Sequence, residues 1–265
     1  MKKLDLSKYT DWASKFDPAL LEQMRVDTYN HSIGSLRGYD CPKCLNKGTF
    51  AFLRDGRICT AECECMIPRR CIIEMERSGL KHSIERLTFD QFNAIEPWQV
   101  FMKKRVIDYA NNPKDWLLLC GAPGSGKTHL CTAVCRELLL SSHEVRYMTW
   151  REKVPAVLAA NFESEKRDAL LHHLKKAEIL YIDDLFKNPE GTSPSKGEIN
   201  LAFELINYRY VANLRTIIST EKSPAELFKI DEATSSRLFE MSKENLIIVK
   251  KGIGKNYRLM DYSFI

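Results

Sequence analysis

A glycine-rich segment at residues 121–128, Gly-Ala-Pro-Gly-Ser-Gly-Lys-Thr, has the residue types and spacing of a phosphate-binding loop. Its glycines allow backbone N–H groups to turn toward a β-phosphate at the start of a helix, where the helix dipole favours negative charge. The Lys127 ammonium fits between a β- and a γ-phosphate, and the Thr128 hydroxyl is a ligand for Mg²⁺. Our candidate nucleotide-binding residues are therefore Gly121, Pro123, Gly124, Ser125, Gly126, Lys127, Thr128 and the following His129.

Two adjacent aspartates follow the apolar run 179–182, and such a loop needs a second magnesium contact from the end of a neighbouring strand. Asp183 is expected to hold Mg²⁺ together with Thr128. Asp184 lies one residue further, where a carboxylate can orient or deprotonate an attacking water. The alternative is that Asp184 only caps the following turn. With Lys127, these two residues are candidates for ATP hydrolysis.

Three further positions could act on the γ-phosphate. Thr220 and Glu221 follow the apolar run 216–219, so they are expected at the carboxyl end of a central strand, where open α/β sheets bind ligands. One of them could sense the γ-phosphate, or the pair could be an ordinary strand end. Arg237 is the candidate for an arginine supplied by a neighbouring subunit, because transition-state charge spreads over the γ-phosphate oxygens. By position alone, Arg237 could equally be a surface residue.

A cluster of cysteines precedes the phosphate loop. Cys41 and Cys44 form one pair, and Cys63 and Cys65 follow eighteen residues later, with turn residues at 46–48 and 55–56 between them. Four thiolates can close a tetrahedral zinc site, which would stabilise a module too small to bury a large core. The alternatives are unligated or redox-active thiols. Cys59 leaves the ligand set open, since Cys59 with Cys63 could replace the pair Cys63 and Cys65.

The elements that must position these residues follow from the apolar pattern. Strand-length apolar runs at 116–120, 145–149, 179–182 and 216–219 alternate with helix-patterned stretches at 128–140, 151–176 and 197–212. This alternation predicts an α/β fold in which a parallel sheet is flanked by helices on both faces. Residues 66–86 are predicted to be a helical connector.

Composition sets wider limits. With 265 residues of which 44% are hydrophobic, the chain can bury a sizeable core. No apolar run approaches the roughly 18 residues of a membrane span, so we expect a cytoplasmic protein without membrane contact. The net charge of +5 leans toward a polyanionic partner but decides nothing alone.

Taken together, these residues resemble the AAA+ replicative helicase loaders of the DnaC and DnaI type, whether bacterial or phage-encoded. The resemblance starts at residues 41–48 and 62–65 and continues through Leu87-Thr-Phe-Asp-Gln-Phe92 to the phosphate loop. It extends through residues 204–209, 216–221 and 230–238 to Asn256-Tyr-Arg258. The phosphate loop and its aspartates occur in many ATPases, whereas the cysteine module followed by Thr-Phe-Asp-x-Phe is far more specific.

The resemblance implies two domains. Residues 1–80 would be a zinc-binding domain with a helical connector that docks on a hexameric DnaB-type helicase. Residues 81–265 would be an AAA+ P-loop NTPase domain that binds ATP, Mg²⁺ and single-stranded DNA. The cofactors implied are ATP, Mg²⁺ and Zn²⁺.

The resemblance also implies roles for single residues. It makes Arg237 the trans-acting arginine, places Phe89 and Phe92 near the adenine, and favours Cys65 over Cys59 as a zinc ligand. One departure concerns the sensor position, where many relatives have Asn and this chain has Glu221, so that Thr220 could take the role. Arg258 resembles a second sensor only loosely.

DNA contacts are less defined. Residues 243–258 and 151–176 carry several Lys and Arg side chains, and Tyr257 lies among those of the first stretch. Basic side chains with aromatics suit a groove for single-stranded nucleic acid. Either segment could equally be a solvated charged face.

Our hypothesis is an ATP-dependent helicase loader for the initiation of DNA replication. Subunits would associate with ATP as a hexamer or spiral, grip single-stranded DNA and place a ring helicase on it, with hydrolysis that is weak or stimulated by partners. The nearest alternative is a transposition helper ATPase of the IstB type, which shares the ATPase part but generally lacks the cysteine module. Two others are a small-molecule P-loop kinase, against which we see no arginine-rich lid, and a zinc-dependent DNA-binding adaptor whose ATP site is only a switch.

Overall fold

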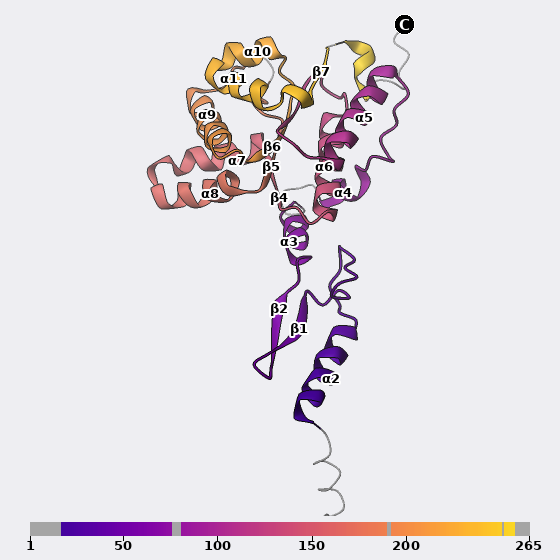
Figure 1. The fold of residues 1–265 in the computed structure, drawn as a ribbon. Coiled ribbons are helices and arrows are strands. Elements are labelled where there is room, and N and C mark those ends of the chain that lie inside the picture. Colours follow the sequence, from indigo (N-terminus) through magenta and orange to yellow (C-terminus); the bar gives the residue numbers. More distant parts are fainter. Residues whose placement is uncertain (1–16, 76–80, 190–191, 251, 258–265) are drawn as a thin grey trace, which may run out of the picture. The chain divides into compact units, whose positions relative to one another are not determined.

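The computed structural model describes residues 17–75, 81–189, 192–250 and 252–257 (Figure 1). The chain forms two compact units, Met1–Arg69 and Arg70–Ile265. The domain boundary predicted at residue 80 lies outside the described residues. The predicted connector contains helices α3 (Met66–Met75) and α4 (Lys81–Arg86). Within the described ranges, no helix combines the length and the apolar character needed to cross a membrane.

The N-terminal unit is built on an antiparallel hairpin, β1 (Thr49–Arg54) and β2 (Arg57–Glu62). Asp55 and Gly56 join the strands with φ angles of 53° and 72°. Left-handed values at both central residues match the two-residue turn that Asp-Gly favours, because its twist fits that of paired strands. The sequence therefore indicated this turn, whereas the strands were not predicted.

Helix α2 (Pro18–His31) is anchored to the edge of this hairpin. The Asn30 side chain donates to the Ala51 carbonyl at 2.9 Å and accepts from the Ala51 N–H at 2.9 Å, as a neighbouring strand would. At the other end of the helix, the Asp17 carboxylate accepts from the Ala19 N–H and caps the helix N-terminus. The Asn30 hydrogen bonds therefore attach α2 to the hairpin, which offers few apolar residues for packing.

The C-terminal unit contains a five-stranded sheet of strand order β4-β5-β6-β3-β7, with every described pair parallel. Its strands are β3 (Leu117–Gly121), β4 (Val145–Thr149), β5 (Ile179–Asp183), β6 (Arg215–Thr220) and β7 (Leu246–Val249). The four predicted apolar runs are confirmed as strands. Strand β7 was not predicted, because its four residues lie in a basic stretch, between the short 3₁₀ turns η3 (Lys243–Asn245) and η4 (Ile253–Lys255).

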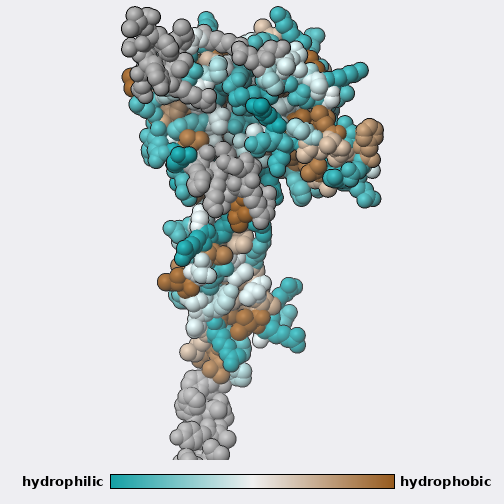
Figure 2. All heavy atoms as spheres, turned by 180° about the vertical axis from the view of Figure 1, so that it is seen from behind, coloured by the Kyte–Doolittle hydropathy of each residue, from teal (hydrophilic) through white to brown (hydrophobic). Residues whose placement is uncertain are grey.

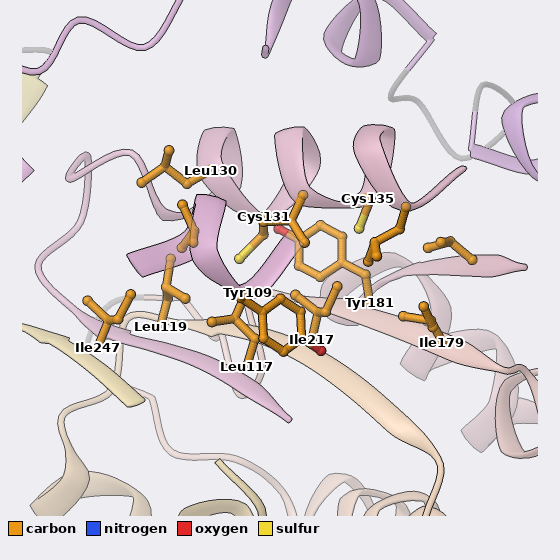
Figure 3. Packing of buried hydrophobic residues seen from close by; sticks show 14 of the residues in the cluster. Tyr109, Leu117, Leu119, Leu130, Cys131, Cys135, Ile179, Tyr181, Ile217 and Ile247 are labelled. Carbon is orange, nitrogen blue, oxygen red and sulfur yellow. The ribbon is translucent and has the colours of Figure 1, made fainter. Parts of the chain in front are cut away.

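Helices cover both faces of the sheet, as predicted. Leu117 and Leu119 point to one face, where they pack with α5 (Pro97–Asn111) and α6 (Lys127–Leu140). In Figure 3, Cys131 and Cys135 of α6 lie over Tyr181 of β5. The opposite face packs against α7 (Trp150–Ala159), α8 (Ser164–Lys176), α9 (Lys196–Val211), α10 (Pro224–Ile230) and α11 (Glu232–Met241). The alternation along β3 therefore divides the core into two layers.

The helix-patterned stretch predicted at 151–176 is helical but divided into two helices. Helix α7 ends at Ala159, a 3₁₀ turn η2 (Ala160–Phe162) follows, and α8 begins at Ser164. Glu163, with φ −119° and ψ 80°, leaves the helical region and breaks the backbone ladder. The apolar spacing alone did not reveal this break, because both helices keep a buried side against the same layer. The helices predicted at 128–140 and 197–212 are confirmed to within one residue at either end.

A fully buried arginine holds α8, α9 and β6 together. The Arg209 guanidinium donates to the carbonyls of Leu174, Lys175 and Ala177 at 3.0, 3.1 and 2.9 Å, and to the Thr216 hydroxyl at 2.9 Å. Carbonyls at the end of a helix lack partners within it, and a cation there is favoured by the helix dipole. Arg209 therefore caps α8 from a neighbouring helix, although burial lowers its pKa to about 10.

Replacing this arginine is expected to destabilise the C-terminal unit strongly. Arg209→Met removes the donors while leaving several buried carbonyls without partners, which we expect to lower the free energy of unfolding by roughly 3 kcal/mol or more. Arg136→Met is the matched control, since Arg136 is 38% exposed and pairs with its neighbour Glu137 on the surface. Its effect should stay within about 0.5 kcal/mol. Chemical denaturation of both variants measures this, and equal effects would contradict the capping role.

Candidate functional site

The phosphate loop connects β3 to α6 and depends on glycine at three positions. Gly121, Gly124 and Gly126 have φ angles of 112°, 68° and 86°, which side chains rarely adopt. A Cβ at Gly121 would lie 1.9 Å from the Val249 carbonyl oxygen, and one at Gly124 would lie 1.9 Å from the Asn256 Oδ1. The loop thus turns tightly at the carboxyl end of a central strand and ends at the N-terminus of α6.

Two of the polar residues in the loop are buried and bonded to its backbone. The Lys127 ammonium, in a residue 5% exposed, donates to the carbonyls of Gly121 and Ala122 at 2.9 and 2.7 Å. Ser125 Oγ donates to the Ala122 carbonyl at 2.8 Å. Burial lowers the pKa of Lys127, while Glu221 and Asp184 oppose this. An ammonium has three donors, so Lys127 keeps a further one for a phosphate.

The Asp183 carboxylate is buried and oriented by four hydroxyl groups. Its Oδ1 accepts from Thr128 Oγ1 at 3.0 Å, from the Tyr181 hydroxyl at 2.6 Å and from Ser219 Oγ, and its Oδ2 accepts from the Tyr147 hydroxyl at 3.1 Å. Thr128 and Asp183, the predicted magnesium residues, are therefore adjacent, and their oxygens are of the kind that Mg²⁺ prefers. The other three hydroxyls were not predicted, although Tyr181 lies two residues before Asp183 and hence on the same face of β5.

Asp184 lies in the left-handed region, with φ 58°, and its side chain takes part in an ion pair. Its Oδ2 accepts from the Lys187 ammonium at 2.7 Å, and the same ammonium donates to Glu221 Oε1 at 3.0 Å. Burial raises the pKa of Asp184, and the Lys187 hydrogen bond opposes this. Asp184 lines the same pocket as the phosphate loop, and Lys187 is a further charged residue there that was not predicted.

Thr220 and Glu221, the two candidates at the end of β6, have side chains in different surroundings. Thr220 is buried, and its hydroxyl donates to the Leu185 carbonyl at 2.8 Å and accepts from the Lys222 N–H at 3.1 Å. It therefore links β6 to the chain after β5. Glu221 instead lines the nucleotide-sized pocket with Asp184 and Lys187.

That pocket has a volume of about 420 Å³. Its lining residues are Leu87, Gln91, Phe92, Asn93, Gly124, Ser125, Gly126, Lys127, Thr128, His129, Asp184, Lys187, Glu221 and Tyr257. Of the predicted binding residues, Phe92 and the segment from Gly124 to His129 line the pocket, whereas Gly121 and Pro123 do not. Phe89 packs against the hydrophobic core.

Aromatic rings form one wall of this pocket. The ring of Phe92 meets those of His129 and Tyr257 edge to face, with centroids 5.2 and 5.3 Å apart. His129 Nε2 lies 2.8 Å from the Thr88 carbonyl, and burial lowers the His129 pKa. The Tyr257 N–H donates to the Gly124 carbonyl at 2.9 Å, which ties the segment after β7 to the phosphate loop. Arg258 lies outside the described residues.

Arg237 on α11 does not line the pocket of its own chain. Its Nε donates to Asn207 Oδ1 at 3.0 Å and its Nη1 to the Ala233 carbonyl at 2.7 Å. The guanidinium also lies 5.1 Å from the ring centroid of Phe203 and 5.5 Å from that of Tyr210. Contact with two rings and an amide holds the charge in a defined place on the surface of the helical layer.

The four predicted zinc ligands come together in the N-terminal unit. The sulfurs of Cys41, Cys44, Cys63 and Cys65 lie within 4.8 Å of one another, with Cys41–Cys63 at 3.8 Å and Cys44–Cys65 at 3.5 Å. A tetrahedral zinc site with Zn–S bonds of about 2.3 Å has sulfur–sulfur edges of about 3.8 Å. The donor set and its spacing therefore fit Zn²⁺. Cys59 lies on β2, outside this cluster.

Donor groups of the backbone and of an arginine surround these thiols. The Gly48 N–H donates to Cys44 Sγ at 3.3 Å. Burial raises the pKa of Cys65, and a hydrogen bond from Arg69 opposes this. Arg69, itself 5% exposed, is held by the Arg37 carbonyl at 2.8 Å and by Asn46 Oδ1 at 2.7 Å. Such donors stabilise the negative charge of metal-bound thiolates.

Comparison with known proteins gives relatives over most of the chain. The family described as "Bacterial DnaA ATPAse domain" matches residues 84–242. The phage-like element PBSX protein XkdC of Bacillus subtilis is 31% identical over 228 residues, which cover 80% of this chain and 83% of the relative. The chromosomal replication initiator protein DnaA of Burkholderia cenocepacia is 32% identical over 157 residues, but these are 57% of this chain and only 29% of that protein.

Solved structures match the C-terminal fold. The crystal structure of the DnaC helicase loader aligns with a TM-score of 0.54 and 22% identity, over 62% of this chain and 96% of that one. The crystal structure of DnaI aligns with a TM-score of 0.52 and 17% identity, over 64% of this chain and 93% of that one. At these identities the matches concern architecture, and they confirm the predicted α/β fold with a helix-flanked parallel sheet.

Proposed function

Because the chain belongs to the family of the bacterial DnaA ATPase domain, an AAA+ family, we propose that it is an ATP-dependent loader of a hexameric DnaB-type helicase. The helicase would be placed on single-stranded DNA at the start of replication. The observation that carries this proposal is the combination, on one chain, of a nucleotide pocket with a separate unit built around four thiols. The first supplies a switch, and the second supplies a surface through which the switch can act on a partner.

The family's chemistry is nucleotide hydrolysis, and the pocket suggests which residues perform it here. Lys127 would contact the β- and γ-phosphates, and Thr128 with Asp183 would hold Mg²⁺. Asp184 would orient the attacking water. When bound, the metal neutralises the charge that develops on the phosphates. Phe92 and Tyr257 would contact the nucleoside, because their rings line the pocket beside the loop.

The position of Arg237 supports self-association. Since this guanidinium lies outside the pocket of its own chain, the nucleotide it serves would be that of a neighbouring copy, in a hexamer or spiral. Turnover by isolated subunits would then be weak and would rise with assembly or partner binding. A site completed between copies makes ATP the signal for assembly.

Helicase docking is assigned to the N-terminal unit. Helix α2 exposes Leu20, Leu21 and Met24 by 52%, 42% and 54%, although its other side contacts the hairpin. In Figure 2, brown apolar side chains interrupt the teal surface of this unit. Exposed apolar side chains on a small metal-stabilised unit suit a protein partner. Single-stranded DNA would contact the C-terminal unit, where the last turn of α8 carries His173, Lys175 and Lys176.

The docking assignment predicts a specific loss of helicase capture. With ATP and the immobilised DnaB-type helicase of the same organism, Cys41→Ser should reduce capture about 10-fold or more, because an incomplete thiol set destabilises the unit. Cys59→Ser is the matched control and should be captured like the wild type, since Cys59 lies outside the cluster. Undiminished capture of a Cys41→Ser protein shown to lack zinc would rule out docking through this unit.

A further inference from the structure

The ion pairs of Lys187 place a second lysine at the mouth of the phosphate loop. Its ammonium bridges Asp184 and Glu221, at 2.7 and 3.0 Å, and all three residues line the pocket together with Gly124 to Thr128. Lys187 follows β5 and Glu221 follows β6, so two neighbouring strands deliver the pair to the same end of the sheet. Nothing in the roles assigned above uses this lysine.

Glu221 needs a neighbouring cation if this end of the pocket is to bind a γ-phosphate. Its position, at the end of the strand beside β3, suits a residue that detects the γ-phosphate. An ionised carboxylate only accepts hydrogen bonds, so Glu221 cannot bind phosphate oxygens itself. The Lys187 ammonium has three donors, and two of them satisfy Asp184 and Glu221. A third donor is left for an anion in the pocket.

The charges that line the pocket also support contact between Lys187 and a phosphate. Its lining includes two carboxylates, Asp184 and Glu221, and two ammonium groups, Lys127 and Lys187. Without Lys187, the pocket would present the carboxylates of Asp184 and Glu221 to a triphosphate with only Lys127 among its lining residues to offset them. A cation held between them removes that repulsion.

We propose that Lys187 is the γ-phosphate-sensing residue of this ATP site and that Glu221 is its positioning residue. This inference rests on the proposed ATP site. Lys187, Asp184 and Glu221 side chains are 32%, 20% and 31% exposed, so their mutual pairing is only moderately strong and can yield to a phosphate. Contact of the third donor with the γ-phosphate would weaken the pair between Lys187 and Asp184 and make that carboxylate more available to water. ADP lacks the group that makes this contact.

Nucleotide discrimination tests the proposal. Calorimetric titration of the full chain with Mg²⁺ and either AMPPCP or ADP gives two dissociation constants per variant. Lys187→Met should weaken AMPPCP about 10-fold or more, as expected for a lost charge-assisted hydrogen bond, and change ADP less than about threefold. Glu221→Ala should weaken AMPPCP selectively as well. The double variant should be no worse than Lys187→Met alone, because Glu221 acts through Lys187.

Arg146→Met is the matched control. Arg146 also pairs with a carboxylate, that of Glu144 at 3.3 Å, and its side chain is 26% exposed, but it lies outside the pocket. Both of its nucleotide affinities should equal those of the wild type. Equal weakening of AMPPCP and ADP by Lys187→Met, or no change in either, would overturn the sensing role. Failure of the wild type to bind either nucleotide would instead overturn the ATP site on which the inference rests.

Discussion

Asp184→Asn and Arg237→Ala are each expected to abolish ATP turnover, yet an equimolar mixture of the two should recover about a quarter of the wild-type rate. Each change alone should slow hydrolysis by about 100-fold or more, because the first removes the carboxylate proposed to orient the attacking water and the second removes the cation proposed to stabilise the transition state. The recovery in the mixture is the informative part, since it depends on where Arg237 acts.

The structure gives the physical reason for the recovery. Asp184 lines the pocket of its own chain, whereas Arg237 is held on α11 by Asn207 and two aromatic rings, away from that pocket. If every active site takes Asp184 from one copy and Arg237 from the next, random assembly leaves about one interface in four with both native residues. Neither variant alone can form such an interface.

Steady-state phosphate release, measured with DNA and helicase present and at several protein concentrations, checks this expectation. ADP affinity close to that of the wild type shows that each variant retains a folded pocket. The phosphate-release rate of each variant alone, at the same total protein concentration, is the baseline. A mixture rate that equals the mean of the two separate rates would show that Arg237 acts within its own chain or not at all, and would refute the shared site.

The sequence was sufficient to predict the phosphate loop and the acidic strand end, because those geometries depend on few residue types. Only glycine tolerates the φ angles at Gly121, Gly124 and Gly126, so the motif itself implies the backbone path. Strands β3 and β5 were equally predictable, since both are buried on both faces and consist mostly of apolar residues. The spacing of the four cysteines likewise predicted that their thiols would cluster.

Other features depend on contacts between distant segments, which local pattern does not contain. Lys187 is held in the site by an ion pair with Glu221, which lies 34 residues further along the chain, so no local pattern around Lys187 indicates its place. Thr220 and Glu221 are neighbours in sequence, but the alternation of a strand sends one to the Leu185 carbonyl and the other to the pocket. Arg209 was visible only as part of a family resemblance, and its capping of α8 needs three segments to meet.

Zinc removal is expected to unfold the N-terminal unit while leaving the ATPase unit intact. Among the described residues of this unit, the buried hydrophobic set is Val26, Ala51 and the four clustered cysteines. Most of that core is therefore the proposed metal site itself. Structural zinc sites contribute about 10 kcal/mol or more of apparent binding free energy, far above what so few apolar side chains supply. The metal and the fold of this unit should consequently be lost together.

Hydrogen exchange before and after metal release distinguishes the two units. The wild type should contain about one zinc per chain, released by a thiol-modifying mercurial and counted with a colorimetric chelator. Release should remove amide protection from β1 and β2 and leave that of β3 to β7 unchanged, because the two units are compact separately. Cys63→Ser should reproduce the loss without the mercurial, and Cys59→Ser should retain both the zinc and the protection. Protected hairpin amides in metal-free protein would mean that hydrogen bonds such as those of Asn30 hold this unit together, and the thiol cluster would then need another role.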